Sequence, residues 1–153
     1  MATSWIPLTS QADLDQLMRT FGDFHDGCLR EAHIWTESFV DTEMRMSVAS
    51  DLETRVRLLI QRQWRDPSAI ELLFEEVTAL HLRPSPQDYD SIIVCALMLS
   101  RDGMFYWAED DDWSLDSPKR DEVTWIAAKK LSWRDVSAWM GPNLHYGPGD
   151  AEI

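Results

Sequence analysis

The chain has 153 residues, 44% of them hydrophobic and 10% aromatic, which is enough to bury the core of one globular domain and excludes wholesale disorder. Its 27 acidic and 14 basic residues give a formal net charge of -13. That field repels phosphate backbones and anionic lipids, so nucleic acid and membrane surfaces are not expected partners, whereas a basic protein is. Acidity also keeps a protein soluble without any partner. The chain has no run of about 18 apolar residues and no signal-peptide pattern, so we expect a cytoplasmic protein.

The first predicted element is an amphipathic helix of about three turns over residues 9–22. Thr9 and Ser10 are suitable N-terminal caps, apolar residues follow at helical spacing, and Gly22 ends the pattern. The helix is followed by a first strand over residues 28–36. The N-terminal part of the chain therefore begins with a helix that leads into a sheet.

The middle of the chain predicts three further strands. Apolar and polar residues alternate in residues 44–48 and 55–61, which indicates two half-buried strands joined by a hairpin connection at residues 50–53. Residues 70–82 also alternate, but the apolar phase slips near residues 75–76, where a β-bulge would absorb the slip. A helix fits part of this last segment as well, and we favour the strand because two prolines follow and a helix cap is missing.

The next predicted strands form a hairpin. Residues 91–99 are apolar on both faces, which predicts a strand in the middle of a sheet. Asp102-Gly103 is a strong hairpin signal, and a strand over residues 104–107 follows it. After an acidic loop, residues 123–131 predict the last strand.

The C-terminal part predicts a short helix and a tail. Residues 132–135 are similar to a capping box, with aspartate in place of the preferred glutamate, and the helix that follows ends at Gly141-Pro142. We expect one α+β domain over residues 1–142 and a flexible tail over residues 143–153. Because short turns join successive strands, the sheet is predicted to be predominantly antiparallel, a curved sheet or open barrel of six to seven strands with the N-terminal helix and the short C-terminal helix against it.

In the sequence FGDFHDGC, residues 21–28, His25 and Asp26 lie between two glycines and close to Cys28. One functional hypothesis is a small metal-dependent hydrolase that binds its metal through His25 and Asp26. Adjacent ligands on one turn are awkward, however, and no HxH or HExxH motif accompanies them. Another hypothesis pairs the imidazole with the Cys28 thiol as a nucleophile, but Cys28 opens an apolar strand, where burial quenches a thiol.

We favour a structural role for Phe24, His25, Asp26 and Gly27. Phe24 would anchor the core, and His25 would bond to a backbone carbonyl of a neighbouring strand. Asp23 or Asp26 would cap a turn, and Gly27 would supply a positive φ at the entry into the strand. On this interpretation the motif sets how the helix meets the sheet. The sequence accordingly predicts no catalytic residue, no metal site and no cofactor.

The FHDG sequence of residues 24–27, followed by the strand sequence of residues 70–77 and the Leu80-x-Leu82 continuation, resembles small uncharacterised bacterial β-rich families. Some of these families are classed among the immunity proteins of polymorphic toxin systems. The resemblance spans roughly residues 21–99. It implies a non-catalytic inhibitor that binds and neutralises a sibling toxin.

The acidic loop of residues 109–116 is the predicted partner-binding surface. Its acids alternate as in a calcium loop, but Leu115 stands where an EF-hand needs glycine, and flanking helices are missing. The predicted contact residues are Glu109, Asp110, Asp111, Asp112, Trp113 and Asp116, with Trp107 beside them as a second aromatic anchor. The predicted function is a non-catalytic protein-binding module, in its sharper form an immunity-type inhibitor of a basic toxin. The alternatives are the hydrolase named above and a small-ligand-binding open barrel.

Overall fold

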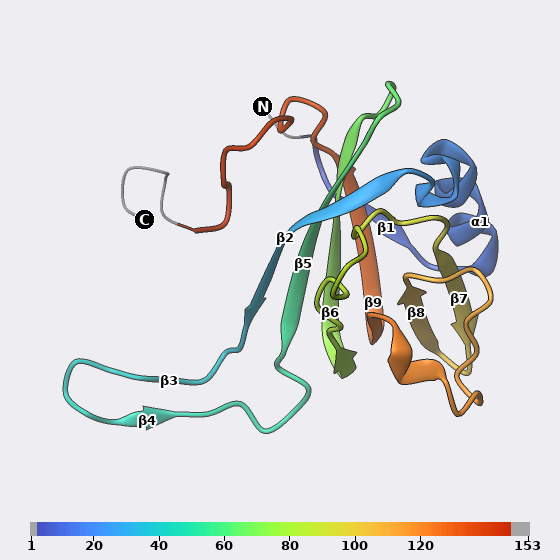
Figure 1. Ribbon diagram of the computed structural model, residues 1–153. Helices are drawn as coiled ribbons and strands as arrows, with labels where there is room; N and C mark the ends of the chain where they lie inside the picture. Colours follow the sequence, from blue (N-terminus) through green and yellow to red (C-terminus); the bar gives the residue numbers. More distant parts are fainter. Residues whose placement is uncertain (1–2, 148–153) are drawn as a thin grey trace.

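The computed structural model describes residues 3–147 and shows a seven-stranded, mostly antiparallel sheet with one α-helix (Figure 1). The strands of this sheet are β1 Ile6–Leu8, β2 Gly27–Trp35, β5 Arg55–Arg62, β6 Ala69–His81, β7 Leu97–Arg101, β8 Met104–Ala108 and β9 Trp125–Asp135. Their order is β2-β5-β6-β9-β8-β7, and β1 pairs with β9 off this path. The predicted α+β class is confirmed, and the sheet does not close into a barrel.

The N-terminal helix forms where the sequence predicts it. Helix α1 spans Gln11–Thr20, and its N-cap Ser10 accepts a hydrogen bond from the backbone N–H of Asp13 at 3.2 Å. Leu14 and Leu17 are buried, so the helix packs its apolar stripe against the sheet near β7 and β8 (Figure 1). Within residues 3–147, no helix combines the length and the apolar character that crossing a membrane requires.

The main core lies between α1 and the curved sheet. Alternate residues of the central strands point to the helix side, as strand geometry requires. The largest fully buried side chains of this core include Phe21, Phe24, Leu58, Ile60, Ile70, Leu72, Phe74 and Trp107. Packed side chains therefore fill the concave side of the sheet.

Strand β5 is buried on both faces, although its alternating sequence predicts burial on one. The second face is covered by residues 136–147, and Leu59, Ala69 and Val136 form a separate core cluster with Trp139 and Tyr146 packed against it. The strand itself is confirmed. Its second buried face arises from chain that lies more than 70 residues further along the sequence.

The predicted short C-terminal helix is not present in the part of the chain that the structure describes. Strand β9 continues through Asp135, because residues 132–135 pair with β6, with Leu73 opposite Ser132 and Ile70 opposite Asp135. The backbone N–H of Trp139 then bonds to Val136 O at 2.7 Å in a turn. Ladder hydrogen bonds to β6 thus replace the local cap that the sequence resembles.

Residues 143–147 contact the sheet. The backbone N–H groups of His145 and Tyr146 donate to the carboxylate of Glu31 at 2.8 and 3.0 Å. Residues 148–153, the remainder of the predicted tail, lie outside the described residues. The described part of this segment is thereby held beside β2 by a side chain of that strand.

The strand over residues 70–82 and its phase slip are confirmed. In β6, Glu76 has a φ of 54°, and the register with β9 shifts between Val77 and Ala79. The backbone N–H of Val77 donates to Thr54 O at 3.1 Å, so pairing resumes one residue out of phase with β5. The helical alternative for this segment is wrong.

The predicted hairpin between residues 44–48 and 55–61 is wrong. Strand β4 Met46–Ser47 pairs with β3 Phe39–Val40 in a separate two-stranded sheet, while β5 pairs with β2. Both short strands are exposed. Figure 1 shows this β3–β4 arm, residues 36–54, extending away from the main sheet.

Residues 91–99 do not form a strand in the middle of the sheet. Strand β7 begins at Leu97 and lies at the sheet edge, and Ile92 and Val94 are exposed. Ile93 is buried and bridges to Gly27 at the start of β2, so this apolar run links the two edges of the curved sheet at one point. We expected residues 91–99 to be buried on both faces. The part before β7 is instead a loop that crosses between the two edges of the curved sheet.

The Asp102-Gly103 hairpin is confirmed. Arg101 pairs with Met104 across the turn, and Asp102 and Gly103 have φ values of 52° and 78°. Two consecutive positive φ values are what a two-residue type I′ hairpin requires, and asparagine, aspartate and glycine accommodate them at the lowest cost.

Candidate functional site

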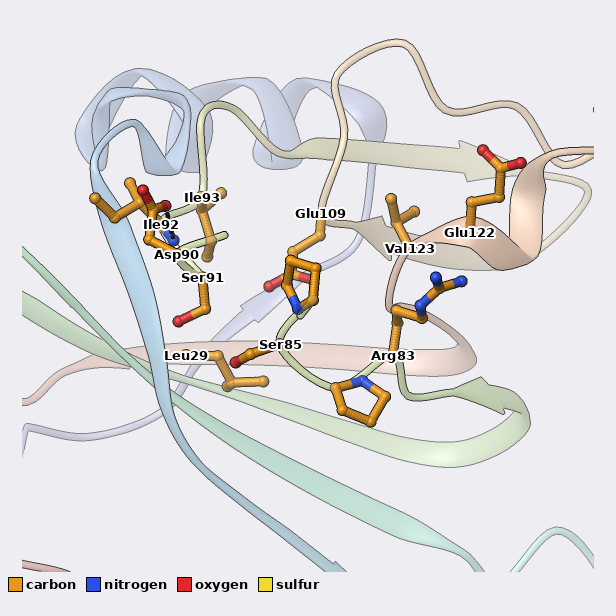
Figure 2. A pocket seen from close by; sticks show the side chains of 12 residues that line it. Leu29, Arg83, Ser85, Asp90, Ser91, Ile92, Ile93, Glu109, Glu122 and Val123 are labelled. Carbon is orange, nitrogen blue, oxygen red and sulfur yellow. Dashed lines mark hydrogen bonds between the residues drawn. The ribbon is translucent and has the colours of Figure 1, made fainter. Parts of the chain in front are cut away.

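A cleft of about 420 Å³ opens at the end of the sheet where β6 and β8 end and β9 begins (Figure 2). Its walls come from β2, from residues 82–96 between β6 and β7, and from residues 109–124 between β8 and β9. The lining residues include Leu29, Arg83, Pro86, Asp90, Ser91, Ile93, Glu109, Glu122 and Val123. This volume lies in the range of about 300–1,000 Å³ that ligand sites occupy.

Glu109 is the central polar side chain of this cleft. In Figure 2 it lies between Leu29 on one side and Arg83 and Val123 on the other. Burial raises the pKa of the Glu109 carboxyl, and its hydrogen bonds with Thr124 oppose that rise. The cleft therefore holds a carboxylate that is short of water and favours a cationic neighbour.

The two loops that form the cleft are joined through one hydroxyl. Thr124 Oγ1 accepts a hydrogen bond from Arg83 N at 2.9 Å and donates to Arg83 O at 3.3 Å. The backbone N–H of Glu109 also donates to Thr124 O at 3.0 Å. These bonds fix the starts of residues 82–96 and 109–124 to the N-terminal end of β9.

The acidic loop is folded around a buried indole. The Trp113 ring lies 5.9 Å from Tyr106 and 5.3 Å from Trp125, and its Nε1–H donates to Arg120 O at 3.0 Å. The loop closes with a short 3₁₀ turn, η2 Arg120–Glu122. The carboxylates on its outer side are consequently presented by ordered backbone.

The predicted contact residues separate into exposed and buried ones. Asp110, Asp111 and Asp112 are exposed, and none of the three forms an ion pair with another described residue. Asp116 is also exposed but pairs with Arg101 at 3.1 Å. Because these groups are solvated and mostly uncompensated, they are available to a partner.

The two predicted aromatic anchors are buried in the fold. Trp107 is fully buried in β8, where its ring lies 5.9 Å from that of Phe24. Trp113 is 7% exposed inside the acidic loop. Their indoles fill the two cores on either side of the β8–β9 region. Burying so large an apolar area stabilises the fold more than leaving it exposed to water would.

The FHDG segment forms the joint between α1 and β2. Phe24 is fully buried against Phe21, with ring centroids 5.0 Å apart, and His25 Nδ1 lies 2.7 Å from the backbone oxygen of Val94. The positive φ values fall at Phe24 and Asp26, at 62° and 57°, as well as at residues 22–23 of the 3₁₀ turn η1 Gly22–Phe24.

Gly27 has no positive φ, in contrast to the expectation. A Cβ at this position would lie 2.9 Å from Phe24 O and 3.3 Å from Gln61 O, so glycine is required by close backbone approach. The segment before β7 bonds to this joint, because Ile93 N–H donates to Gly27 O at 2.7 Å and Asp26 N–H donates to Ile93 O at 3.0 Å.

His25 and Asp26 are exposed and line a second cleft of about 610 Å³ together with Arg62 and Trp64. His25 Nε2 lies 3.5 Å from Asp26 Oδ2. Cys28 does not line this cleft. Among residues 3–147, no three histidine, cysteine or carboxylate side chains lie close enough together to hold a metal ion.

Both cysteines are free thiols of intermediate burial. Burial first, and then the nearby carboxylates of Asp111, Asp23 and Asp26, raise the pKa of the Cys95 thiol. Since the thiolate is the nucleophilic form, these surroundings favour the less nucleophilic thiol form of Cys95.

Comparisons of the chain with models of protein families, with curated proteins and with solved structures found no match. The similarity of the FHDG segment to immunity-type families therefore stays a prediction.

One wall of the cleft is not predicted from the sequence. Pro84 and Pro86 indicate only the end of a strand, whereas residues 82–96 carry Arg83 and Asp90 to the cleft. The predicted contact residues end at Asp116, although the acidic loop continues to Glu122 and residues 109–122 contain seven carboxylates and two basic side chains. The acidic run continuing to Glu122 was a visible signal for the wider surface.

Proposed function

We propose that this protein is a non-catalytic binding module that docks a basic segment of a partner protein at the cleft around Glu109. The observation that carries the proposal is the half-buried Glu109 carboxylate, whose pKa is raised by burial, beside the uncompensated Asp110, Asp111 and Asp112. A lysine or arginine side chain in the cleft would offset the cost of that buried charge. The net charge of -13 adds attraction at longer range.

The cleft fits a side chain of a polypeptide better than a bulky ligand. Its apolar lining from Leu29, Ile93 and Val123 matches the aliphatic stem of lysine or arginine, and Glu109 and Glu122 match the charged end. The three aspartates at residues 110–112 provide a solvated rim, where complementary charge mainly raises the association rate.

The proposal is tested with a fluorescently labelled lysine decapeptide as the probe. The triple variant Asp110→Asn/Asp111→Asn/Asp112→Asn is expected to bind it about tenfold more weakly at low salt, because neutralising three rim carboxylates at about 0.2 to 1 kcal/mol each removes about 0.6 to 3 kcal/mol of attraction. Binding to the unaltered protein should weaken steeply as salt rises from about 0.01 M to about 0.15 M.

The matched control is Asp15→Asn/Asp66→Asn/Asp102→Asn, which removes the same amount of charge from exposed positions elsewhere. This control should keep most of the affinity of the unaltered protein. Equal losses in the two triple variants would show that the probe responds to net charge only, and the proposed site would be withdrawn.

The sharper form of the proposal is an immunity-type inhibitor, supported by the resemblance of residues 21–99 to such families. A toxin encoded beside this gene would be the basic partner, and the protein would occlude it through the acidic loop. Co-expression with the neighbouring gene products is expected to restore growth only when residues 110–112 are intact. Rescue that ignores those three aspartates would contradict docking at the acidic loop.

A small metal-dependent hydrolase remains a second candidate, because His25 and Asp26 line an open cleft beside exposed Trp64. Metal content after purification, measured for the unaltered protein and for His25→Ala, separates the two functions. Zinc or manganese bound in stoichiometric amount, and lost in a variant with unchanged circular dichroism, would favour the hydrolase over the binding module.

A further inference from the structure

The β3–β4 arm, residues 36–54, is a projecting hairpin with no role in the core. It leaves the sheet after β2 and returns at β5, and Figure 1 shows it reaching away from the edge opposite β7. Its two strands pair only with each other among the elements of residues 3–147. Each strand therefore keeps one open backbone edge.

The arm exposes apolar side chains on both faces. Val40 lies opposite Met46 on one face, and Phe39 lies opposite Ser47 on the other. The exposed apolar residues and their exposed fractions are Phe39 59%, Val40 50%, Met44 83%, Met46 67%, Val48 68% and Leu52 39%. Several exposed apolar side chains on one projecting element indicate an interaction surface, because the fold gains nothing by exposing them.

The tip of the arm is ordered despite its exposure. Asp41 Oδ1 accepts hydrogen bonds from the backbone N–H groups of Glu43 and Arg45, each at 2.9 Å, and Asp41 Oδ2 lies 3.0 Å from Arg45 Nε. Met44 adopts a φ of 67° within this turn. The hairpin is thus held in a strand-like form before any partner binds, which reduces the entropy that docking must overcome.

The base of the arm is fixed to the sheet by side chains. Ser38 Oγ donates to the Glu53 carboxylate at 2.7 and 2.8 Å, and Arg55 pairs with Glu37 and, at 3.3 Å, with Glu75. A cleft of about 260 Å³ at this base is lined by four glutamates against one arginine and one lysine. The surface that adjoins the apolar arm is therefore acidic.

Charge decides which occupant fits the arm. Residues 36–54 carry five carboxylates and one arginine, and that arginine, Arg45, already pairs with Asp41 and Glu43. A second copy of the chain would bring the same acidic arm and a net charge of -13 against the first. The acidic arm and the net negative charge both attract a basic chain. The charge that opposes self-association therefore favours a basic partner.

We propose that the β3–β4 arm docks an extended segment of a basic protein, which adds a strand to an open edge of the hairpin and covers its apolar side chains. Strand addition supplies backbone hydrogen bonds to the open edge, and alternate side chains of the added strand contact Val40 and Met46. The basic side chains between them face the carboxylates of the arm and its base. This surface is separate from the Glu109 cleft, so the proposal does not depend on docking there.

The probe is a blocked peptide of about ten residues that alternates lysine and valine, which forms one strand of the required chemistry. The unaltered protein is expected to bind it, with increased hydrogen-exchange protection at the amides of residues 36–54. The variant Val40→Thr/Met46→Thr keeps strand propensity and removes apolar surface, and it should bind at least about tenfold more weakly. Peptides alternating lysine with serine, or glutamate with valine, should also bind at least about tenfold more weakly.

The matched control variant is Ile6→Thr/Met140→Thr, which removes two exposed apolar side chains of the same kinds outside the arm and should leave binding unchanged. Binding of the lysine–valine peptide that survives Val40→Thr/Met46→Thr, or that protects only residues 109–122, would overturn the arm proposal. A self-associated protein in sedimentation experiments that becomes monomeric in Val40→Thr/Met46→Thr would also overturn it, since a second copy would then be the occupant. The lysine decapeptide and the Asp110 to Asp112 variant report on the Glu109 cleft independently.

Discussion

At the scale of single residues, the joint between α1 and β2 concentrates backbone strain. Gly22, Asp23, Phe24 and Asp26 all have positive φ values, between 57° and 62°. An aromatic residue in this region is unfavourable, and its burial between Phe21 and Trp107 offsets the cost. Within the FHDG sequence, Phe24 and Gly27 therefore serve the packing of the fold, whereas His25 and Asp26 lie at the surface.

We predict that Gly27→Ala destabilises the protein by about 1 to 3 kcal/mol, because its Cβ would meet the backbone oxygens of Phe24 and Gln61. Chemical denaturation of the two proteins measures the loss. Gly147→Ala is the control, since a Cβ there meets nothing within 4 Å. Equal stability of Gly27→Ala and the unaltered protein would contradict the close approach.

Glu109→Gln is predicted to raise stability at neutral pH while weakening binding of the lysine decapeptide. Burial raises the pKa of this carboxyl in the folded state. The folded state therefore gains relative stability when the carboxyl is protonated and loses it as pH rises through the folded pKa. Glutamine is neutral at every pH and avoids the loss.

The thermal unfolding midpoints of Glu109→Gln and the unaltered protein should differ at pH 7 and converge as pH falls toward 4. Glu122→Gln, an exposed carboxylate at the rim of the same cleft, is the matched control and should change the midpoint little. A difference that persists unchanged at low pH would point to a cause other than ionisation.

At the scale of elements, the C-terminal segment is held on the second face of the sheet by a buried ionic network. Glu71 is 0% exposed, its Oε1 lies 2.6 Å from Arg134, and its Oε2 accepts a hydrogen bond from Tyr146 Oη at 2.5 Å. Arg57 lies 3.6 Å from the same carboxylate and 4.5 Å from the centroid of the Tyr146 ring. Tyr146 thereby joins residues 136–147 to β5, β6 and β9.

We predict that Tyr146→Phe lowers stability by about 1.5 kcal/mol, the contribution expected of a hydrogen bond to a charged group. Burial first, and then the hydrogen bond to Glu71, raise the pKa of this phenol. Its contribution is full below the ordinary phenol pKa of about 10 and is lost as pH rises toward the raised folded value.

Equilibrium unfolding at pH 7 and at pH values above about 10 tests the Tyr146 prediction, since the gap between Tyr146→Phe and the unaltered protein should narrow at high pH. Tyr89→Phe is the control. Tyr89 is 80% exposed, so removing its hydroxyl should leave the stability unchanged. If Tyr146→Phe matches Tyr89→Phe at pH 7, the network does not hold the segment.

At the scale of the whole molecule, the net charge of -13 acts on stability as well as on partner choice. Carboxylates outnumber basic side chains by seven to two in residues 109–122 and by five to one in the β3–β4 arm, at different places on the fold. Their mutual repulsion disfavours the compact state, and a basic partner would relieve it. Docking and stabilisation should therefore occur together.

Raising salt from about 0.01 M to about 0.15 M should raise the thermal unfolding midpoint, because the screening length falls from about 30 Å to about 8 Å. The variant Asp110→Asn/Asp111→Asn/Asp112→Asn, with three fewer charges, should respond less. Differential scanning calorimetry measures both. A midpoint that is constant or falls with salt would show that ion pairs in the fold outweigh the repulsion.

The sequence by itself determined the elements whose signals are local. The Ser10 cap and apolar spacing specify α1, the turn chemistry of Asp102-Gly103 specifies the β7–β8 hairpin, and alternation specifies β5 and β6 with a slip near residue 76. Each signal acts between residues that are close in the chain, so no distant contact is needed to interpret it. The net charge follows from the composition of the chain, so it too can be determined without the fold.

Only the tertiary structure decided what distant segments do to one another. Residues 44–48 alternate like a half-buried strand, but β5 pairs with β2, and the arm is left exposed. Residues 132–135 resemble a helix cap, but they pair with β6, and Trp113 lies near acids yet is buried. Strand pairing and the burial of a face depend on segments that are distant in sequence. A local pattern does not specify which distant segment packs against it. The Glu109 cleft, built from three such segments, follows from the fold alone.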